Sequence, residues 1–324
     1  MKAAVVHEWG QQPRYLDFPE PQPRDGTVVA AVEASALTNL SRMVIMGKHY
    51  SSKEIQLPAI AGVDGVVRLE DGTRVYTGSL APYGLMAERT LLYPSGGVPV
   101  PEHVDSVTAA AVPNPGLSAW MSLDHAAQTK PGDHVLLLGA TGVTGSLAVQ
   151  LAKFVFGAGR VVVAGRNPER LEWLRTVGAD DVITLGTDDL TESVVAQHSA
   201  RPFDAVIDYL WGTPAQQTLA ALAAAHSSTH FHATRFIQVG SMTGASISVD
   251  AATLRSTGIT LQGVGIGSVP PEAIMRARTE GLPRLFSMLE AGELQLTTAA
   301  RPLSDIENVW AAKEPSGTRV VITP

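Results

Sequence analysis

The middle of the chain alternates short apolar runs with helical patterns, and this alternation most restricts how the chain folds. The runs are rich in Val, Ile, Leu and Ala, as strands are when helices cover both faces of their sheet. Six such runs occur, at Val135–Leu138, Val161–Ala164, Val182–Leu185, Ala205–Tyr209, Phe236–Val239 and Ile259–Val264. Because helical stretches separate them, the sequence predicts an α/β fold with a doubly wound parallel sheet.

The helical stretches carry their own start and stop signals. Asn167 is a favourable N-cap, Pro168 suits a first helical turn, and Gly178 suits the residue after a helix end. Helices are expected at Leu117–Gln128, Ser146–Val155, Pro168–Val177, Asp188–His198 and Pro214–Ala225.

The two ends of the chain have a different pattern. Residues 1–115 contain short β-branched segments separated by Pro, Gly and Asp, with a hairpin signal at Asp71-Gly72. Residues 268–324 contain one further helix and strand and no nucleotide motif. We expect them to complete this mostly β domain, while residues 116–267 form the other domain. Strands are predicted at Lys2–His7, Thr27–Ala34, Gly65–Leu69, Arg74–Tyr76 and Thr318–Ile322, and the helix lies within Glu272–Ala291.

A glycine-rich turn, Gly139–Gly145, joins the first apolar run to the helix that follows it. Backbone N–H groups at a helix start favour an anion, and glycine allows a pyrophosphate to come close to the backbone. Ala140, Gly142 and Gly145 fit an A-x-G-x-x-G variant of the dinucleotide motif, with Ala140 at its first position. The turn therefore predicts a dinucleotide site, and a tight turn with no ligand is the alternative.

The end of the second strand predicts which dinucleotide binds. An NAD site usually has Asp or Glu about 20 residues after the glycine turn, whereas this chain has Gly165-Arg166-Asn167, followed by Arg170. Arginine can bind a 2′-phosphate that a carboxylate would repel. The pattern favours NADPH, and a solvated first helical turn is the alternative for both arginines.

Composition excludes several classes of partner. The chain has 24 Lys and Arg against 31 Asp and Glu, for a formal charge of −7, and no basic stripe. No apolar stretch approaches the ~18 residues that span a bilayer, and polar residues come too early for a signal peptide. We expect no nucleic-acid or membrane partner and a cytoplasmic location.

The chain contains no cysteine, which excludes disulfides, a cysteine nucleophile and thiolate metal ligands. His226, His230 and His232 fall within seven residues and could gather a transition metal. No carboxylate lies within that run, so we expect a solvated loop and no metal site.

Several stretches together resemble the medium-chain dehydrogenase/reductase superfamily, and within it the zinc-free quinone oxidoreductase group. The resemblance runs from end to end, and its motifs are Asn39 with Gly47–Tyr50, Ala61–Val67, Gly116–Trp120, Gly139–Gly145 with Ala148–Lys153, and Val177–Ile183. The aspartate that follows the family's asparagine is missing, because Leu40-Ser41-Arg42 stands there. The resemblance implies a GroES-like β domain beside a Rossmann domain.

The resemblance also implies roles for individual residues. The pyrophosphate of NADPH is expected to contact Thr141, Gly142, Val143 and Thr144. Its 2′-phosphate is expected to contact Arg166 and Arg170, with Gly165 before them. The ribose and nicotinamide are expected to contact Gly240, Ser241, Val264, Gly265 and Ile266, and Asn39 is a further residue expected to bind NADPH. Tyr50 is expected to donate to the substrate carbonyl oxygen or to form a pocket wall. Asn39 is a second candidate contact to cofactor or substrate.

The function that follows is NADPH-dependent, zinc-independent hydride transfer to a quinone or α,β-unsaturated carbonyl. Zinc catalysis is disfavoured because only Asp64 could act as a ligand where the zinc enzymes have a Gly-His-Glu stretch. A zinc-free alcohol or aldehyde dehydrogenase and a non-catalytic NADPH-binding redox sensor stay open as alternatives. A homodimer that pairs the Ile259–Val264 edge strands is also implied.

Overall fold

The computed structural model describes residues 1–24, 26–49, 52–53, 55–225 and 231–324. The chain forms two compact units, one of residues 1–114 with 283–324 and one of residues 115–282. Gly281 lies against Trp120, where an added β-carbon would be 2.8 Å from Cδ2 of the indole. Both residues belong to the second unit, which extends to residue 282, whereas the sequence analysis placed the boundary at 267.

The first unit is built mainly from antiparallel strands. Among the described residues, one sheet has the order β15-β16-β3-β5-β6-β8, with β7 also paired to β3, and a smaller sheet has the order β2-β1-β4. The predicted hairpin joins β5 to β6, and Gly72 in its turn has φ +88°. The strands are β1 (Lys2–Val6), β2 (Arg14–Asp17), β3 (Val28–Ala36), β4 (Ala59–Ile60), β5 (Asp64–Arg68), β6 (Arg74–Gly78), β7 (Arg89–Leu92), β8 (Val98–Pro99), β15 (Thr297–Pro302) and β16 (Thr318–Thr323).

Short helices close the first unit. Trp310 and Val309 of α11 pack with Ile45 of α1 and with β1 and β16 in one buried apolar cluster. The helices are α1 (Asn39–Ile45), α2 (Ser106–Ala111), α10 (Leu282–Glu290) and α11 (Ile306–Ala311).

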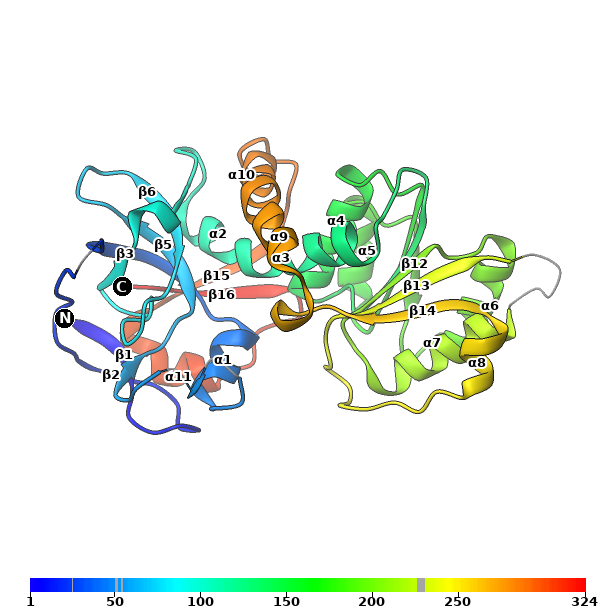
Figure 1. Ribbon diagram of the computed structural model, residues 1–324, viewed down its shortest axis with the longest axis horizontal. Helices are drawn as coiled ribbons and strands as arrows, with labels where there is room; N and C mark the ends of the chain where they lie inside the picture. The colour runs from blue at the N-terminus through cyan, green and yellow to red at the C-terminus, as the bar shows by residue number, and fades with distance from the viewer. Residues whose placement is uncertain (25, 50–51, 54, 226–230) are drawn as a thin grey trace. The chain divides into compact units, whose positions relative to one another are not determined.

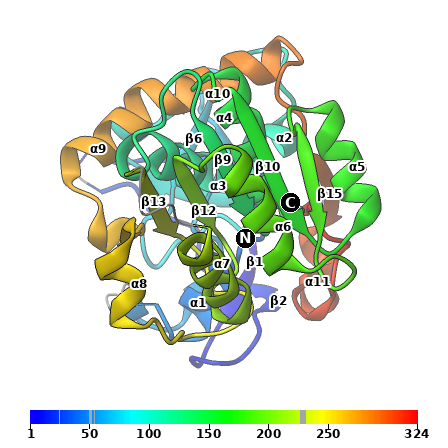
Figure 2. The same ribbon diagram turned by 90° about the vertical axis from the view of Figure 1, so that its right-hand side faces the viewer.

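The second unit contains a parallel sheet with the strand order β11-β10-β9-β12-β13-β14. Figure 2 shows four of these strands side by side, from β13 through β12 and β9 to β10. The order reverses between β9 and β12, and ligands of open α/β sheets bind at such a switch point, outside the carboxyl ends of the strands. The strands are β9 (His134–Leu138), β10 (Arg160–Gly165), β11 (Asp181–Thr184), β12 (Ala205–Asp208), β13 (Ala233–Gln238) and β14 (Gly258–Gly263).

Helices cover this sheet, so its central strands are buried. All five residues of β9 are buried, which explains their continuous apolar pattern. On one face, α6, α7 and α8 lie along β12, β13 and β14 (Figure 1). The helices of this unit are α3 (Pro113–Met121), α4 (Val143–Phe154), α5 (Pro168–Thr176), α6 (Leu190–Ala200), α7 (Gly212–Ala224), α8 (Ala251–Ser256) and α9 (Pro271–Arg276).

Two predicted helices are divided by π-helical turns. The stretch expected as Leu117–Gln128 is α3 followed by the turn Ser122–Ala126, and Glu272–Ala291 is α9, the turn Ala277–Gly281 and α10. No helix in the described part of the chain is both long and apolar enough to cross a bilayer.

Candidate functional site

The glycine-rich turn follows β9 at the switch point. Gly139 has φ +81°, a conformation that favours glycine, and the N–H groups of Gly139 and Ala140 donate to Ala164 O at 2.9 and 3.1 Å. The turn is therefore fixed to the end of β10. Gly139, not Ala140, supplies the left-handed turn that the sequence motif assigned to its first position.

Helix α4 begins directly after this turn with an open end. Its N-cap is Gly142, which has no side chain to cap the helix. The first-turn N–H groups of Val143, Thr144 and Gly145 have no partner within the helix. The helix is 12 residues long, so its dipole adds positive potential at the same point. These donors suit a phosphate group.

The other two glycines of this region allow close packing. A β-carbon on Gly145 would lie 2.6 Å from Cα of Ala140, so only glycine lets α4 begin this close to the turn. A β-carbon on Gly165 would lie 2.4 Å from Cγ2 of Thr141, so the end of β10 can pass the turn only without a side chain. A β-carbon on Gly142 would meet Gly139 O at an ordinary 3.5 Å.

The two arginines after β10 lie in different surroundings. Arg166 is exposed, and its side chain makes no hydrogen bond or ion pair with the residues that the structure describes. Arg170 is half-buried, with Cζ 4.0 Å from the centroid of the Trp173 ring, and burial lowers the pKa of its guanidinium. Asn167 caps α5 by accepting from Arg170 N, and the first acid after β10 is Glu169 in that first turn.

Two further groups of predicted residues follow β13 and β14. Gly240 N donates to Asp208 O at 3.1 Å, and Ser241 after it is exposed. Val264 is buried, whereas Gly265 and Ile266 are exposed. Because the strands are parallel, these residues lie at the same sheet edge as the glycine turn.

Asn39, a predicted contact in the first unit, is the exposed first residue of α1. Thr38 caps this helix by accepting from Ser41 N at 3.0 Å. Tyr50 lies outside the described residues. The structure thus places the predicted residues of the second unit at the carboxyl ends of its parallel strands, whereas Asn39 belongs to the first unit.

The possible metal ligands can be followed only in part. His226 and His230 lie outside the described residues, and His232 places Nε2 3.0 Å from Phe203 O and 3.4 Å from Asp204 Oδ1. Within the described ranges, no group of three or more His, Asp or Glu is arranged to hold a metal ion.

Asp64, the other residue considered as a ligand, is buried in the first unit. Its Oδ2 accepts from the Tyr76 hydroxyl at 2.8 Å. Burial raises the pKa of the Asp64 carboxyl to about 6.

Asp208 was missed at the sequence level. It ends β12 beside the switch point, is fully buried, and accepts from the backbone N–H groups of Leu210 and Trp211. Burial raises the pKa of this carboxyl to about 6, and the two backbone bonds oppose the shift. The one sequence signal was an acidic residue at the end of an otherwise apolar run.

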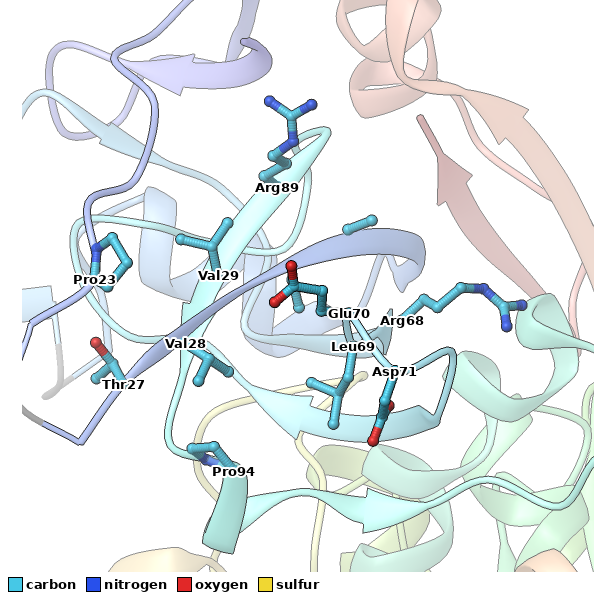
Figure 3. Close-up of a pocket in the computed structure, with 12 residues that line it drawn as sticks. Pro23, Thr27, Val28, Val29, Arg68, Leu69, Glu70, Asp71, Arg89 and Pro94 are labelled. Atoms are coloured by element: carbon cyan, nitrogen blue, oxygen red, sulfur yellow. The ribbon is translucent and has the colours of Figure 1, made fainter.

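A large groove of about 920 Å³ lies in the first unit, between β3 and the β5–β6 hairpin (Figure 3). None of the predicted site residues lines it. Its two arginines are engaged elsewhere, since Arg68 pairs with Glu33 and Arg89 with Glu20. The groove therefore contains no predicted contact to the nucleotide.

Comparisons with known proteins agree with this geometry. The family described as zinc-binding dehydrogenase matches residues 143–280. A probable NADPH-dependent quinone reductase of Emericella nidulans is 26% identical over 369 residues, covering 100% of both chains. A chloroplastic NADPH-dependent alkenal/one oxidoreductase of Arabidopsis thaliana is 29% identical over 195 residues, covering 53% of this chain and 48% of the relative.

The fold also matches a solved structure over its whole length. The quinone oxidoreductase of Thermus thermophilus, solved also in complex with NADPH, superposes with a TM-score of 0.80 at 26% identity and covers 100% of both chains. The predicted combination of a Rossmann unit with a GroES-like β unit is confirmed by this match and by the sheet order. By these matches the chain is similar to the medium-chain dehydrogenase/reductase superfamily, and within it to the quinone oxidoreductases.

Proposed function

We propose that this protein is an NADPH-dependent, zinc-independent oxidoreductase that transfers a hydride to a quinone or an α,β-unsaturated carbonyl. The observation that carries the proposal is the pairing of two features at one sheet edge. The open end of α4 lies at the switch point, and the neighbouring strand β10 ends in exposed Arg166 instead of a carboxylate. The quinone and alkenal/one reductases among the relatives support the acceptor class.

The glycine turn and α4 bind the pyrophosphate in this proposal. The N–H groups of Val143 and Thr144 donate to its oxygens, and Gly142 leaves room for them. Thr141 is held beside this point by its contact with Gly165. When bound, NADPH supplies the hydride from its nicotinamide ring.

The arginines after β10 set the preference for the phosphorylated cofactor. Arg166 is exposed and without a partner among the described residues, so its guanidinium is available to a 2′-phosphate. Arg170 is stacked on Trp173 at the start of α5, where it adds positive charge beside the same position. A carboxylate in place of Arg166 would repel the phosphate.

The nicotinamide end lies along the loops after β13 and β14. Gly240 and Ser241 contact the ribose, and Val264, Gly265 and Ile266 line the nicotinamide. Asn39 contributes a polar contact. Tyr50 donates to the carbonyl oxygen on which negative charge builds as the hydride arrives at carbon.

Zinc independence rests on the chemistry of the chain's own residues. The chain has no cysteine, and Asp64, the one candidate carboxylate, is buried and accepts from the Tyr76 hydroxyl. No acid or base beyond the tyrosine hydroxyl is required, because quinones and enones accept hydride at carbon.

We also propose that the protein is a cytoplasmic homodimer. Strand β14 lies at the edge of the six-stranded sheet, and Leu261 on it is 39% exposed. Pairing two such edges would remove both from solvent. Light scattering in solution gives the test, and a monomer at micromolar concentration would exclude the dimer.

The central experiment is a steady-state assay of the purified protein with NADPH. The acceptors are 1,2-naphthoquinone and a series of enones, and the loss of NADPH absorbance is followed. Turnover with these acceptors, and none of NADP⁺ with simple alcohols, is the expected result. NADP⁺-dependent alcohol oxidation would favour the dehydrogenase alternative, and NADPH binding without oxidation by any acceptor would favour the sensor.

A further inference from the structure

Asp208 connects two loops at the point where the strand order reverses. Its Oδ1 accepts from Leu210 N at 2.8 Å and from Trp211 N at 3.1 Å, and its Oδ2 also accepts from Trp211 N at 3.1 Å. Its backbone carbonyl accepts from Val239 N at 2.8 Å and Gly240 N at 3.1 Å. One fully buried residue therefore fixes the first residues after β12 and after β13.

The loop that the carboxylate holds is strained. Trp211 has φ +58°, and Gly212 follows with φ +59°. A bulky residue keeps a left-handed conformation only where its surroundings impose it. Thr243 holds the loop from the other side, since its N–H donates to Leu210 O at 2.9 Å and its hydroxyl to Trp211 O at 2.7 Å.

The same loop lies against both neighbouring parts of the predicted nucleotide site. A β-carbon on Gly139 would be 2.9 Å from Cδ2 of Leu210 and 3.3 Å from Cβ of Tyr209. A β-carbon on Gly240 would be 2.4 Å from Tyr209 O. The loop thus packs directly on the glycine turn on one side and on Gly240 on the other. A shift of this loop would displace both.

We infer that Asp208 is a positioning residue for NADPH, whose carboxylate keeps residues 209–212 in place so that the glycine turn and Gly240 hold the spacing that the nucleotide requires. Asp208 is 0% exposed, so it acts through this loop and not by contact with the nucleotide. The inference rests on the proposed function, because it assumes that this sheet edge binds NADPH.

The test is Asp208→Asn, assayed for NADPH binding by fluorescence titration and for turnover. Asparagine keeps one acceptor oxygen, but its NH₂ group replaces Oδ2, which accepted a hydrogen bond from Trp211 N. Two donors then face each other at this point. Loss of a buried bond to a charged group predicts a rise of about tenfold or more in the Kd for NADPH. With NADPH and acceptor both saturating, kcat should stay within about twofold.

Two further variants separate positioning from stability. Asp204→Asn alters a carboxylate at the other end of the same strand, where Oδ2 accepts from His134 N at 2.7 Å, and it should leave the Kd for NADPH unchanged. Thr243→Val removes the hydroxyl bond to Trp211 O and should raise the Kd severalfold. Thr243→Val tests the inference even if Asp208→Asn does not fold.

The outcomes also distinguish the inference from the function on which it rests. Wild-type protein that neither binds nor oxidises NADPH would overturn the proposed function. Wild-type protein that binds NADPH, with both Asp208→Asn and Thr243→Val binding equally well, would overturn the inference alone. A fall in kcat at unchanged Kd would overturn it too.

Discussion

Gly165 lies so close to Thr141 that a β-carbon at position 165 would be 2.4 Å from Cγ2 of the threonine. The end of β10 therefore fixes the glycine turn by direct contact as well as by the two hydrogen bonds to Ala164 O. This contact joins the predicted 2′-phosphate position to the predicted pyrophosphate position.

The variant Gly165→Ala should push Thr141 out of place. Overpacking of this kind costs about 1–3 kcal/mol, so we expect the melting temperature to fall by several degrees and NADPH binding to weaken. Thr141→Ser removes Cγ2, the atom in conflict, and should restore part of both losses in the double variant. Thermal unfolding and NADPH titration measure these effects, and a single variant indistinguishable from wild type would contradict the contact.

The buried Asp64 carboxyl should make stability depend on pH. Burial raises the pKa of this carboxyl to about 6 in the folded state, from 3.8 when it is exposed in the unfolded chain. Between these pH values the unfolded chain loses the proton first. The contribution of this group to stability is therefore greatest below pH 3.8 and falls by about 3 kcal/mol as pH rises to about 6.

Denaturant unfolding across this pH range checks the sign. Asp64→Asn should flatten the difference in stability between about pH 4 and about pH 7 relative to wild type. Tyr76→Phe removes a hydrogen bond that lowers the pKa of Asp64, so the fall should continue to higher pH. A variant Asp64→Asn with the same pH dependence as wild type would show that the carboxyl titrates normally.

Metal removal should leave catalysis intact. Without cysteine, the chain lacks the ligands of the usual zinc sites of its superfamily. We expect purified protein to contain far less than one zinc per chain and to keep its NADPH oxidation rate after dialysis against a chelator. Stoichiometric zinc, with activity lost on chelation and regained on zinc addition, would exclude the zinc-independent mechanism.

The sequence predicted the second unit well, because its signals are local. Buried parallel strands read as continuous apolar runs, and Asn167 and Gly178 marked the start and end of α5, where Asn167 accepts from Arg170 N and Gly178 has φ +121°. The short helices α1, α2, α8 and α11 were not predicted. Helices of six or seven residues depend on tertiary packing, as Trp310 of α11 illustrates in the core of the first unit.

Two features of the site needed three-dimensional information. The motif placed its first position at Ala140, but Gly139 takes the left-handed conformation because the turn must meet Ala164 O at the end of β10. Asp208 looked like an ordinary strand end, and its role became visible only from the loop that folds back onto its carboxylate.

Arg166 is the residue that should select NADPH over NADH. The direct measurement compares the Kd values of NADPH and NADH for wild type, Arg166→Asp and the control Arg175→Asp in the last turn of α5. Wild type should prefer NADPH, and Arg166→Asp should lose about tenfold or more in affinity for NADPH with little change for NADH. Arg175→Asp should keep the preference. Equal losses for both cofactors in Arg166→Asp, or no preference in wild type, would contradict the assignment.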